Sequence, residues 1–278
     1  MAYDLVTAYL RRLPRGAHPA HPLHRTADDR VVGTFHAAEL SSVFQPVRGR
    51  DGAIVGHAAY VRCHGNGAAE LSPWQVFALA ASDDELVRLD RLCRTVHAIN
   101  YFASAAEEWR LHLAVEHRLL SAVPDEHGRA FERVLRGLGI QTRRVVIDLP
   151  EAANAHPALL AHVIANYRYR GYKVAVRSRG GVAAVEQVSF FRPDVVRLDA
   201  RDFARDGLAE VVQCVHAAGA QALVEFIETS ARLSSAQSAG ADLVQGFTVR
   251  RPDTELERAP LSADQGGALW FDGGALLI

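Results

Sequence analysis

From residue 43 onward, short runs rich in β-branched residues alternate with longer segments whose apolar residues recur at helical spacing. Several of these longer segments end in glycine, the residue that commonly closes a helix in the left-handed conformation. They are Gly139, Gly171, Gly219 and Gly240. This alternation is typical of βα units, in which each helical crossover returns the chain to a parallel sheet. We expect strands at 43–49, 57–63, 110–115, 143–150, 173–178, 194–200, 221–228 and 241–247.

The first two strands form the exception to parallel pairing. Asp51-Gly52 lies between them, and glycine accepts the positive φ of a hairpin turn, so we expect an antiparallel pair. Eight strands without a long linker favour a closed, TIM-like (β/α)8 barrel over an open doubly wound sheet. We place this barrel at residues 36–252, after an N-terminal extension (1–35) and before a C-terminal extension (253–278) that packs on it.

We expect residues 1–42 to hold a short amphipathic helix, a His/Pro-rich loop and a second helical stretch, and LWFDGGALLI at the C-terminus to form a hairpin. In the loop, His18, His21 and His24 recur every three residues, but the interleaved prolines favour a solvated loop over a metal site.

The charge balance excludes some classes of function. The chain has 31 Lys and Arg against 32 Asp and Glu, which disfavours a protein that neutralises many nucleic-acid phosphates. It has no apolar run of about 20 residues and no secretory signal pattern, so we expect a cytoplasmic protein that binds no membrane. Cys63, Cys93 and Cys214 are too far apart for a metal knuckle, and we interpret them as reduced packing residues.

Barrels of this kind carry their functional groups at the carboxyl ends of the strands. Six pieces of sequence stand in order along these predicted strands and the helix after the second: FQPV (44–47) with IVGHAAYVR (54–62), LDRLCR (89–94), VVIDLPE (145–151), RPDVVRLD (192–199), VEFIET (224–229) and GADLVQGFTVRRP (240–252). Together they resemble the EAL family, bacterial phosphodiesterases that linearise the second messenger cyclic di-GMP. The resemblance implies an EAL-type barrel whose first strand is antiparallel.

The resemblance also shows which catalytic positions differ. The Glu that names the family falls on Ala58, the strand-end Asn on Ala114, and the paired Asp of the D-D-F-G turn on Arg177 and Ser178. The loop that follows, GGVAAVEQ, lacks the family's T-G-Y-S-S-L pattern. The remaining positions are Asp148 for the first Glu of E-x-x-E, Arg197 for the Lys, and the retained Glu151, Asp199, Glu225, Glu228 and Gln245.

Active relatives hold two Mg²⁺ or Mn²⁺ ions in a strongly negative site, whereas Asp148, Glu225, Arg177 and Arg197 carry no net charge. Hard cations need several oxygen ligands. A guanidinium stays positively charged and would occupy the position of a metal-bridging carboxylate. We therefore expect the acidic residues to be vestigial, with no catalytic residue, no metal and no cofactor.

Two interpretations of the remaining residues stay open. Gln45, Arg62 and Gln245 stand at ligand-contacting positions of the family, or else Arg62 pairs with Glu225 or Asp199 and Gln45 caps a strand end. Tyr60, which replaces a Leu, either obstructs a ligand or stacks on it. Arg177 and Arg197, with Arg179, form an anion-binding fork, or they pair with Asp148 and Glu225. We favour the ion pairs, because buried carboxylates without a partner are costly.

His57 is interpreted as a packing residue rather than a general base, and Ser178 lacks the pattern of a hydrolase triad. We therefore expect a catalytically inactive regulatory or scaffold protein that acts through an unidentified protein partner. A non-hydrolysing cyclic di-GMP receptor is the first alternative, and a residual phosphodiesterase is the second. The resemblance also suggests a homodimer.

Overall fold

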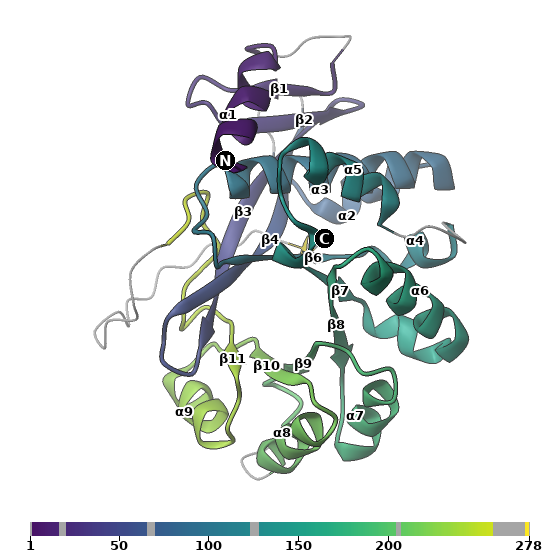
Figure 1. Cartoon of the computed structure of the whole chain (residues 1–278), viewed down its shortest axis with the longest axis vertical. Coiled ribbons are helices and arrows are strands. Elements are labelled where there is room, and N and C mark those ends of the chain that lie inside the picture. The colour runs from purple at the N-terminus through teal and green to yellow at the C-terminus, as the bar shows by residue number, and fades with distance from the viewer. Residues whose placement is uncertain are drawn as a thin grey trace.

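Eight strands close into a barrel in the computed structural model, which describes residues 2–16, 21–65, 70–122, 128–203, 207–257 and 276–277 (Figure 1). The predicted TIM-like (β/α)8 barrel is confirmed, and each predicted strand has a counterpart. The barrel strands are β3 (Ala38–Gly49), β4 (Ile54–His64), β6 (Arg110–Ala114), β7 (Val145–Leu149), β8 (Lys173–Ser178), β9 (Val195–Asp199), β10 (Gln221–Glu225) and β11 (Leu243–Val244).

Strand β3 runs antiparallel to both of its neighbours in the barrel, β4 and β11, as expected for the first strand. The remaining neighbours pair in parallel. The β3–β4 turn contains Gly52 at φ +77°, which only glycine adopts without strain. The hairpin predicted from Asp51-Gly52 is therefore confirmed.

Helices cover the outside of the barrel between the strands (Figure 1). The four glycines predicted to end helices all have φ between +71° and +82°. The α-helices after β4 are α2 (Pro73–Ala78), α3 (Asp83–Phe102), α4 (His117–Ala122), α5 (Arg129–Gly137), α6 (Pro157–Tyr169), α7 (Val182–Ser189), α8 (Leu208–Ala217) and α9 (Ser230–Ser238), with 3-10 turns at Thr142–Arg144 (η1) and Glu151–Ala155 (η2).

The N-terminal segment departs from the prediction. It begins with a helix, α1 (Ala2–Arg12), but the predicted second helical stretch is wrong, because it forms β2 (Val31–Phe35) and the start of β3. Val31 and Val32 are buried, as β-branched residues on a sheet surface tend to be. Strand β1 (Leu23–Arg25) pairs with β2, and β2 pairs with β3, so this segment extends the sheet of the barrel.

The His/Pro-rich segment is only partly a loop. His24 lies in β1 and is buried, which corrects the expectation of a solvated segment, whereas His18 lies outside the described residues. Two short strands, β5 (Glu70–Leu71) and β12 (Leu276–Leu277), pair with β4. The rest of the predicted C-terminal hairpin lies outside the described residues.

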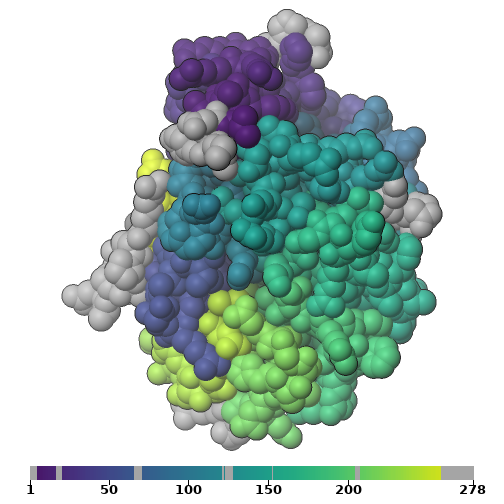
Figure 2. Space-filling view, viewed as in Figure 1, coloured from purple at the N-terminus to yellow at the C-terminus, as the bar shows by residue number. Residues whose placement is uncertain are grey.

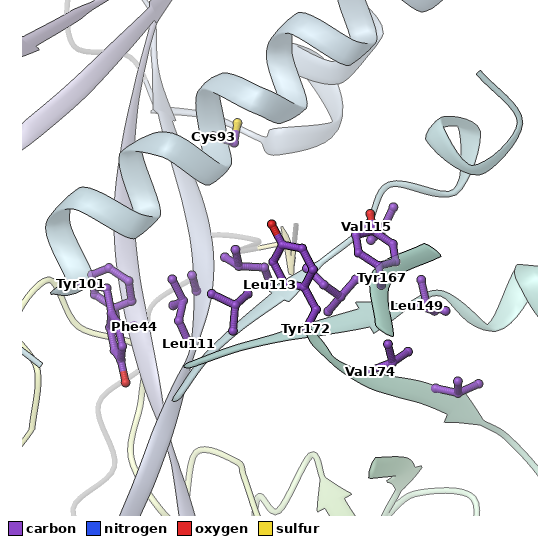
Figure 3. Close-up of a cluster of buried hydrophobic side chains, with 14 of the residues drawn as sticks. Phe44, Cys93, Tyr101, Leu111, Leu113, Val115, Leu149, Tyr167, Tyr172 and Val174 are labelled. Atoms are coloured by element: carbon purple, nitrogen blue, oxygen red, sulfur yellow. The ribbon is translucent and has the colours of Figure 1, made fainter. Parts of the chain in front are cut away.

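The main hydrophobic core lies between the barrel wall and its helices (Figure 3). Helix α3 packs Cys93 and Tyr101 there, opposite Leu111 and Leu113 of β6 (Figure 3). The N-terminal segment occupies one end of the long axis of the molecule, and α8 and α9 lie near the other (Figures 1 and 2). No helix in the described ranges has the length and apolarity to cross a membrane.

Candidate functional site

Side chains inside the barrel form an apolar layer and a polar layer. Because alternate residues of a strand face the same side, residues two positions apart on a barrel strand both face the interior, at successive heights along the strand. The apolar layer consists of Val47, Val146, Ala175, Val195, Leu223 and Leu243. One step toward the carboxyl ends of the parallel strands, the polar layer contains Gln45, Ala58, His112, Asp148, Arg177, Arg197, Glu225 and Gln245.

Arg197 of β9 lies at the centre of the polar layer. Its side chain is 1% exposed, and Nη1 lies 2.7 Å from Asp148 Oδ2. Nη2 lies 2.7 Å from Glu225 Oε2 and also donates to Gln245 Oε1 at 2.7 Å. The guanidinium thus joins β7, β9, β10 and the end of β11, and it stands between the two carboxylates.

A second cation and a histidine complete this cluster. Arg177 of β8 lies 2.8 Å from Glu225 Oε1 through its Nε, and His112 of β6 lies 3.5 Å from Asp148 Oδ1 through its Nδ1. Each carboxylate therefore has two basic neighbours. The arrangement matches the ion-pair interpretation of Arg177 and Arg197 rather than an anion-binding fork.

The electrostatics of Asp148 and Arg197 reflect this pairing. Burial raises the pKa of Asp148, but the charge of Arg197 and the contact with His112 outweigh it and hold that pKa below its ordinary value of 3.8. Burial lowers the pKa of Arg197, and the charges of Asp148 and Glu225 raise it above its ordinary value. Both side chains therefore stay charged at neutral pH.

Gln45, Tyr60 and Gln245 form a closed hydrogen-bonded group beside Arg197. Gln245 Nε2 donates to Gln45 Oε1 and to the Tyr60 hydroxyl, both at 2.9 Å. The Tyr60 hydroxyl donates to Gln45 Oε1 at 3.0 Å, and Gln45 Nε2 donates to the carbonyl of Arg250 at 2.8 Å. Gln45 thus lies in mid-strand and links to the segment after β11, so its predicted role as a strand-end cap is wrong.

Gly246 holds Gln245 in place. A Cβ at position 246 would lie 2.3 Å from the backbone nitrogen and oxygen of Ile227, and Ile227 donates its backbone N–H to the carbonyl of Gln245 at 3.1 Å. Only glycine permits this approach of two backbones. Gly246 therefore allows the backbone contact with Ile227 that fixes the position of Gln245.

Asp199 has a separate partner that the sequence analysis missed. Arg201 donates to both of its carboxylate oxygens, at 2.6 Å from Nη2 and 2.9 Å from Nε, and stacks at 3.9 Å on the ring of Phe226. Phe226 has φ +59°, which is rare for a bulky residue. Burial raises the pKa of Asp199, while its hydrogen bonds from Arg201 lower it below its ordinary value.

The other predicted site residues lie outside the polar layer. Arg62 shares the face of β4 that carries Tyr60, but it is exposed, and no ion pair within the described ranges joins it to Glu225 or Asp199, so that predicted pairing is wrong. Arg179 pairs with Asp202 at 3.1 Å and lies 4.0 Å from Glu151. Glu228, just before α9, lies 3.7 Å from Arg232 of that helix.

Ala58 and Ala114 offer the site only methyl groups, and both are buried. Among the described residues, no group of three or more His, Cys, Asp or Glu side chains is arranged to hold a metal ion. The two carboxylates of the polar layer, Asp148 and Glu225, have Arg197 between them. The donor set does not fit a pair of divalent ions.

The surroundings of His57, Ser178 and the three cysteines agree with packing roles. His57 is fully buried against Tyr101 and Trp109, and burial lowers its pKa to about 3, which agrees with a packing role. Ser178 is buried, and its hydroxyl has no hydrogen-bond partner in the described part of the chain, so no triad forms. The three cysteines are free, and burial raises the pKa of Cys63 to about 12.

His112 and Arg201 were missed by the sequence analysis, although simple spacing signals exist. His112 lies two residues before Ala114 on the same strand face, and Arg201 lies two residues after Asp199.

Comparison with protein families finds the EAL domain, matched over residues 28–252. No curated protein matches the sequence. Among solved structures, the Bacillus subtilis YkuI protein, with an EAL domain, in complex with substrate c-di-GMP and calcium, is 22% identical with a TM-score of 0.66. The match covers 79% of this chain and 57% of YkuI.

The Xanthomonas citri FimX EAL domain in complex with c-di-GMP is 21% identical, also with a TM-score of 0.66. That match covers 79% of this chain and 91% of the FimX chain. At these identities the two structures establish a common fold, the EAL-type barrel, and leave function to the residues of this chain.

Proposed function

Because this chain belongs to the EAL domain family, we propose that it is a non-hydrolysing member that acts in cyclic di-GMP-linked signalling through contacts with a protein partner. The observation that carries this proposal is the buried Arg197 between Asp148 and Glu225. Two-metal hydrolysis needs two cations that clamp the attacking and leaving oxygens of the phosphodiester.

A guanidinium in this position opposes a divalent ion. Repulsion between its charge and a dication about 4 Å away is roughly 8 kcal/mol at an effective dielectric constant near 20. Asp148 Oδ2 and Glu225 Oε2, which could ligate the ion, already accept hydrogen bonds from Arg197, and Arg177 Nε lies 2.8 Å from Glu225 Oε1. Alanine at positions 58 and 114 supplies no replacement ligand.

Turnover is the direct test of this proposal. The protein should release no linear dinucleotide from cyclic di-GMP in Mg²⁺ or Mn²⁺, as followed by chromatography over hours. The matched control is the Glu225→Ala variant, which removes the carboxylate that both arginines contact. Product formed by the unaltered protein and lost in Glu225→Ala would overturn the proposal in favour of a residual phosphodiesterase.

The exposure of Arg62 supports a second candidate function, a cyclic di-GMP receptor. Arg62 lies two positions after Tyr60 on the same face of β4, toward the carboxyl end of the barrel, where Arg177 is 28% exposed. Gln45, Arg197 and Gln245 are less suited to bind a ligand, because they are buried and hydrogen-bonded to one another or to neighbouring site residues.

Calorimetry separates the two candidates. A receptor should give saturable heat with cyclic di-GMP at tens of micromolar protein, and Arg62→Ala should weaken it. Arg133→Ala is the matched control, because Arg133 is an exposed arginine on α5, away from the barrel mouth. Absence of heat for the unaltered protein would dispose of the receptor and leave the partner-based function.

Action through a protein partner is supported by apolar side chains on the outer helices. Tyr169 at the end of α6 is 89% exposed and Phe190 after α7 is 83% exposed. A photo-crosslinking residue at position 190 should capture a defined partner in cells that express the protein. The same residue at position 133 should not capture it, and equal capture from both positions would argue against a specific surface.

A further inference from the structure

The amino end of the barrel, where the parallel strands begin and opposite the ion-pair cluster, contains a cavity of about 480 Å³. Its floor includes Val146 and Val195 of the apolar layer, so the layer separates this cavity from the ion-pair cluster at the other end. Ligand pockets in proteins commonly have volumes of about 300–1,000 Å³. The cavity is therefore large enough for a small molecule.

Basic side chains dominate the charged lining. Arg110, Arg168, Lys173 and Arg192 line the cavity, against a single carboxylate, Asp194. Arg110 and Lys173 occupy the inward-facing positions of β6 and β8, two residues before His112 and Ala175. Because residues two positions apart on a strand face the same side, Arg110 and Lys173 belong to the barrel interior rather than to its outer surface.

The one acidic residue is engaged by two of these cations. Lys173 Nζ lies 2.7 Å from Asp194 Oδ1, and Arg168 Nη2 lies 3.6 Å from Asp194 Oδ2. Within the described ranges, the exposed guanidinium groups of Arg110 and Arg192 have no ion-pair partner. Arg192 is also held at φ +51°, and its carbonyl accepts from Arg168, which fixes the backbone of the segment that carries it.

We propose that this cavity at the amino end of the barrel binds a small molecule that carries a polyphosphate group. Four cations against one carboxylate leave three net positive charges, which suits a ligand with several negative charges. Guanidinium groups match phosphate oxygens in bidentate geometry. This excess of positive charge favours a polyphosphate, which carries several negative charges, over a ligand with a single carboxylate. Val146 and Val195 offer an apolar contact to the organic part of the ligand.

Titration with sodium tripolyphosphate, followed by calorimetry at constant ionic strength, tests the proposal. The unaltered protein should bind one equivalent saturably, and inorganic sulfate should bind far more weakly. Arg110→Gln and Arg192→Gln should each weaken binding by about tenfold, the loss expected for one hydrogen bond to a charged group. Neither side chain makes an ion pair with a described residue that the variant would break, and circular dichroism should confirm that both variants fold.

Arg133→Gln is the matched control, because it removes the same charge from the exposed face of α5. It should leave the affinity unchanged. Equal weakening in this control would show non-specific attraction, and a lack of saturation with millimolar tripolyphosphate would exclude the site. Tighter binding of a hexaglutamate peptide than of tripolyphosphate would overturn the ligand class in favour of an acidic segment of a protein.

Discussion

At the scale of single residues, each ion pair at the carboxyl end of the barrel depends on the other charged residues of the cluster. Arg197 has carboxylates on two strands, and Arg177 adds a second cation to Glu225. Removing one partner of such a buried group leaves an uncompensated charge, which typically costs about 3–5 kcal/mol. The network therefore stabilises the barrel only as a complete set.

Asp148 gives a pH-dependent test of this network. Its pKa in the folded protein is below its ordinary value of 3.8, so the carboxylate contributes stability at pH values above about 3.8 that is lost as the pH falls through the folded pKa. We predict that Asp148→Asn is less stable than the unaltered protein at pH 7, and that this difference in unfolding free energy narrows below pH 4. Urea denaturation at several pH values measures it. A difference that stays constant down to pH 3 would contradict the ion pair.

At the scale of elements, the barrel strands and most helices were predictable from the sequence. Glycines at helix ends and β-branched runs are local signals, and Gly139 and Gly171 have the expected positive φ. The segment at 31–42 was not predictable in this way, because Val31 gains its strand geometry from distant contacts. Asn100 of α3 donates to its carbonyl at 2.7 Å and accepts from its N–H at 2.8 Å.

The same limit applies to the candidate site. The pairing of Arg177 and Arg197 with carboxylates could be predicted from charge and strand-end position. The group formed by Gln45, Tyr60 and Gln245 could not, because it depends on where β3, β4 and the end of β11 meet in space. Partners separated by as many as 200 positions leave no local signal in the sequence.

The contact between Gly246 and Ile227 predicts a steric effect. Gly246→Ala places a methyl group 2.3 Å from the backbone of Ile227, so the loops after β10 and β11 must separate. We expect a loss of about 1–3 kcal/mol in unfolding free energy, which is usual for overpacking. Gly137→Ala in α5 is the control, because a Cβ there meets no atom within 4 Å. Equal denaturation midpoints for the two variants would contradict the close approach.

Asn100 predicts how firmly the N-terminal strands are attached. Asn100→Ala leaves two backbone groups of Val31 without their partner, each at a cost of about 1–3 kcal/mol if they stay buried. Hydrogen exchange of the amides in β2 should accelerate while that in β8 stays slow. Asn166→Ala is the control, because among the described residues the side chain of Asn166 bonds to His162 within its own helix, α6. Unchanged exchange in β2 would show that α3 does not hold this strand.

At the scale of the whole molecule, one apolar layer separates two polar ends of the barrel. The carboxyl end carries compensated charges, with Arg197 neutralised by its neighbours, whereas the amino end has an excess of cations in an open cavity. The two ends therefore differ in what they can bind. We propose that this EAL domain holds no pair of metal ions at the carboxyl end of its barrel, where Arg197 stands between Asp148 and Glu225.

The location of Mn²⁺ in crystals of the protein grown with millimolar manganese tests this account most directly. Anomalous scattering at the manganese edge should show no ion within ligand distance of Asp148 or Glu225, and Arg197 should remain between them. Two anomalous peaks bridged by these carboxylates, with the guanidinium displaced, would contradict the account.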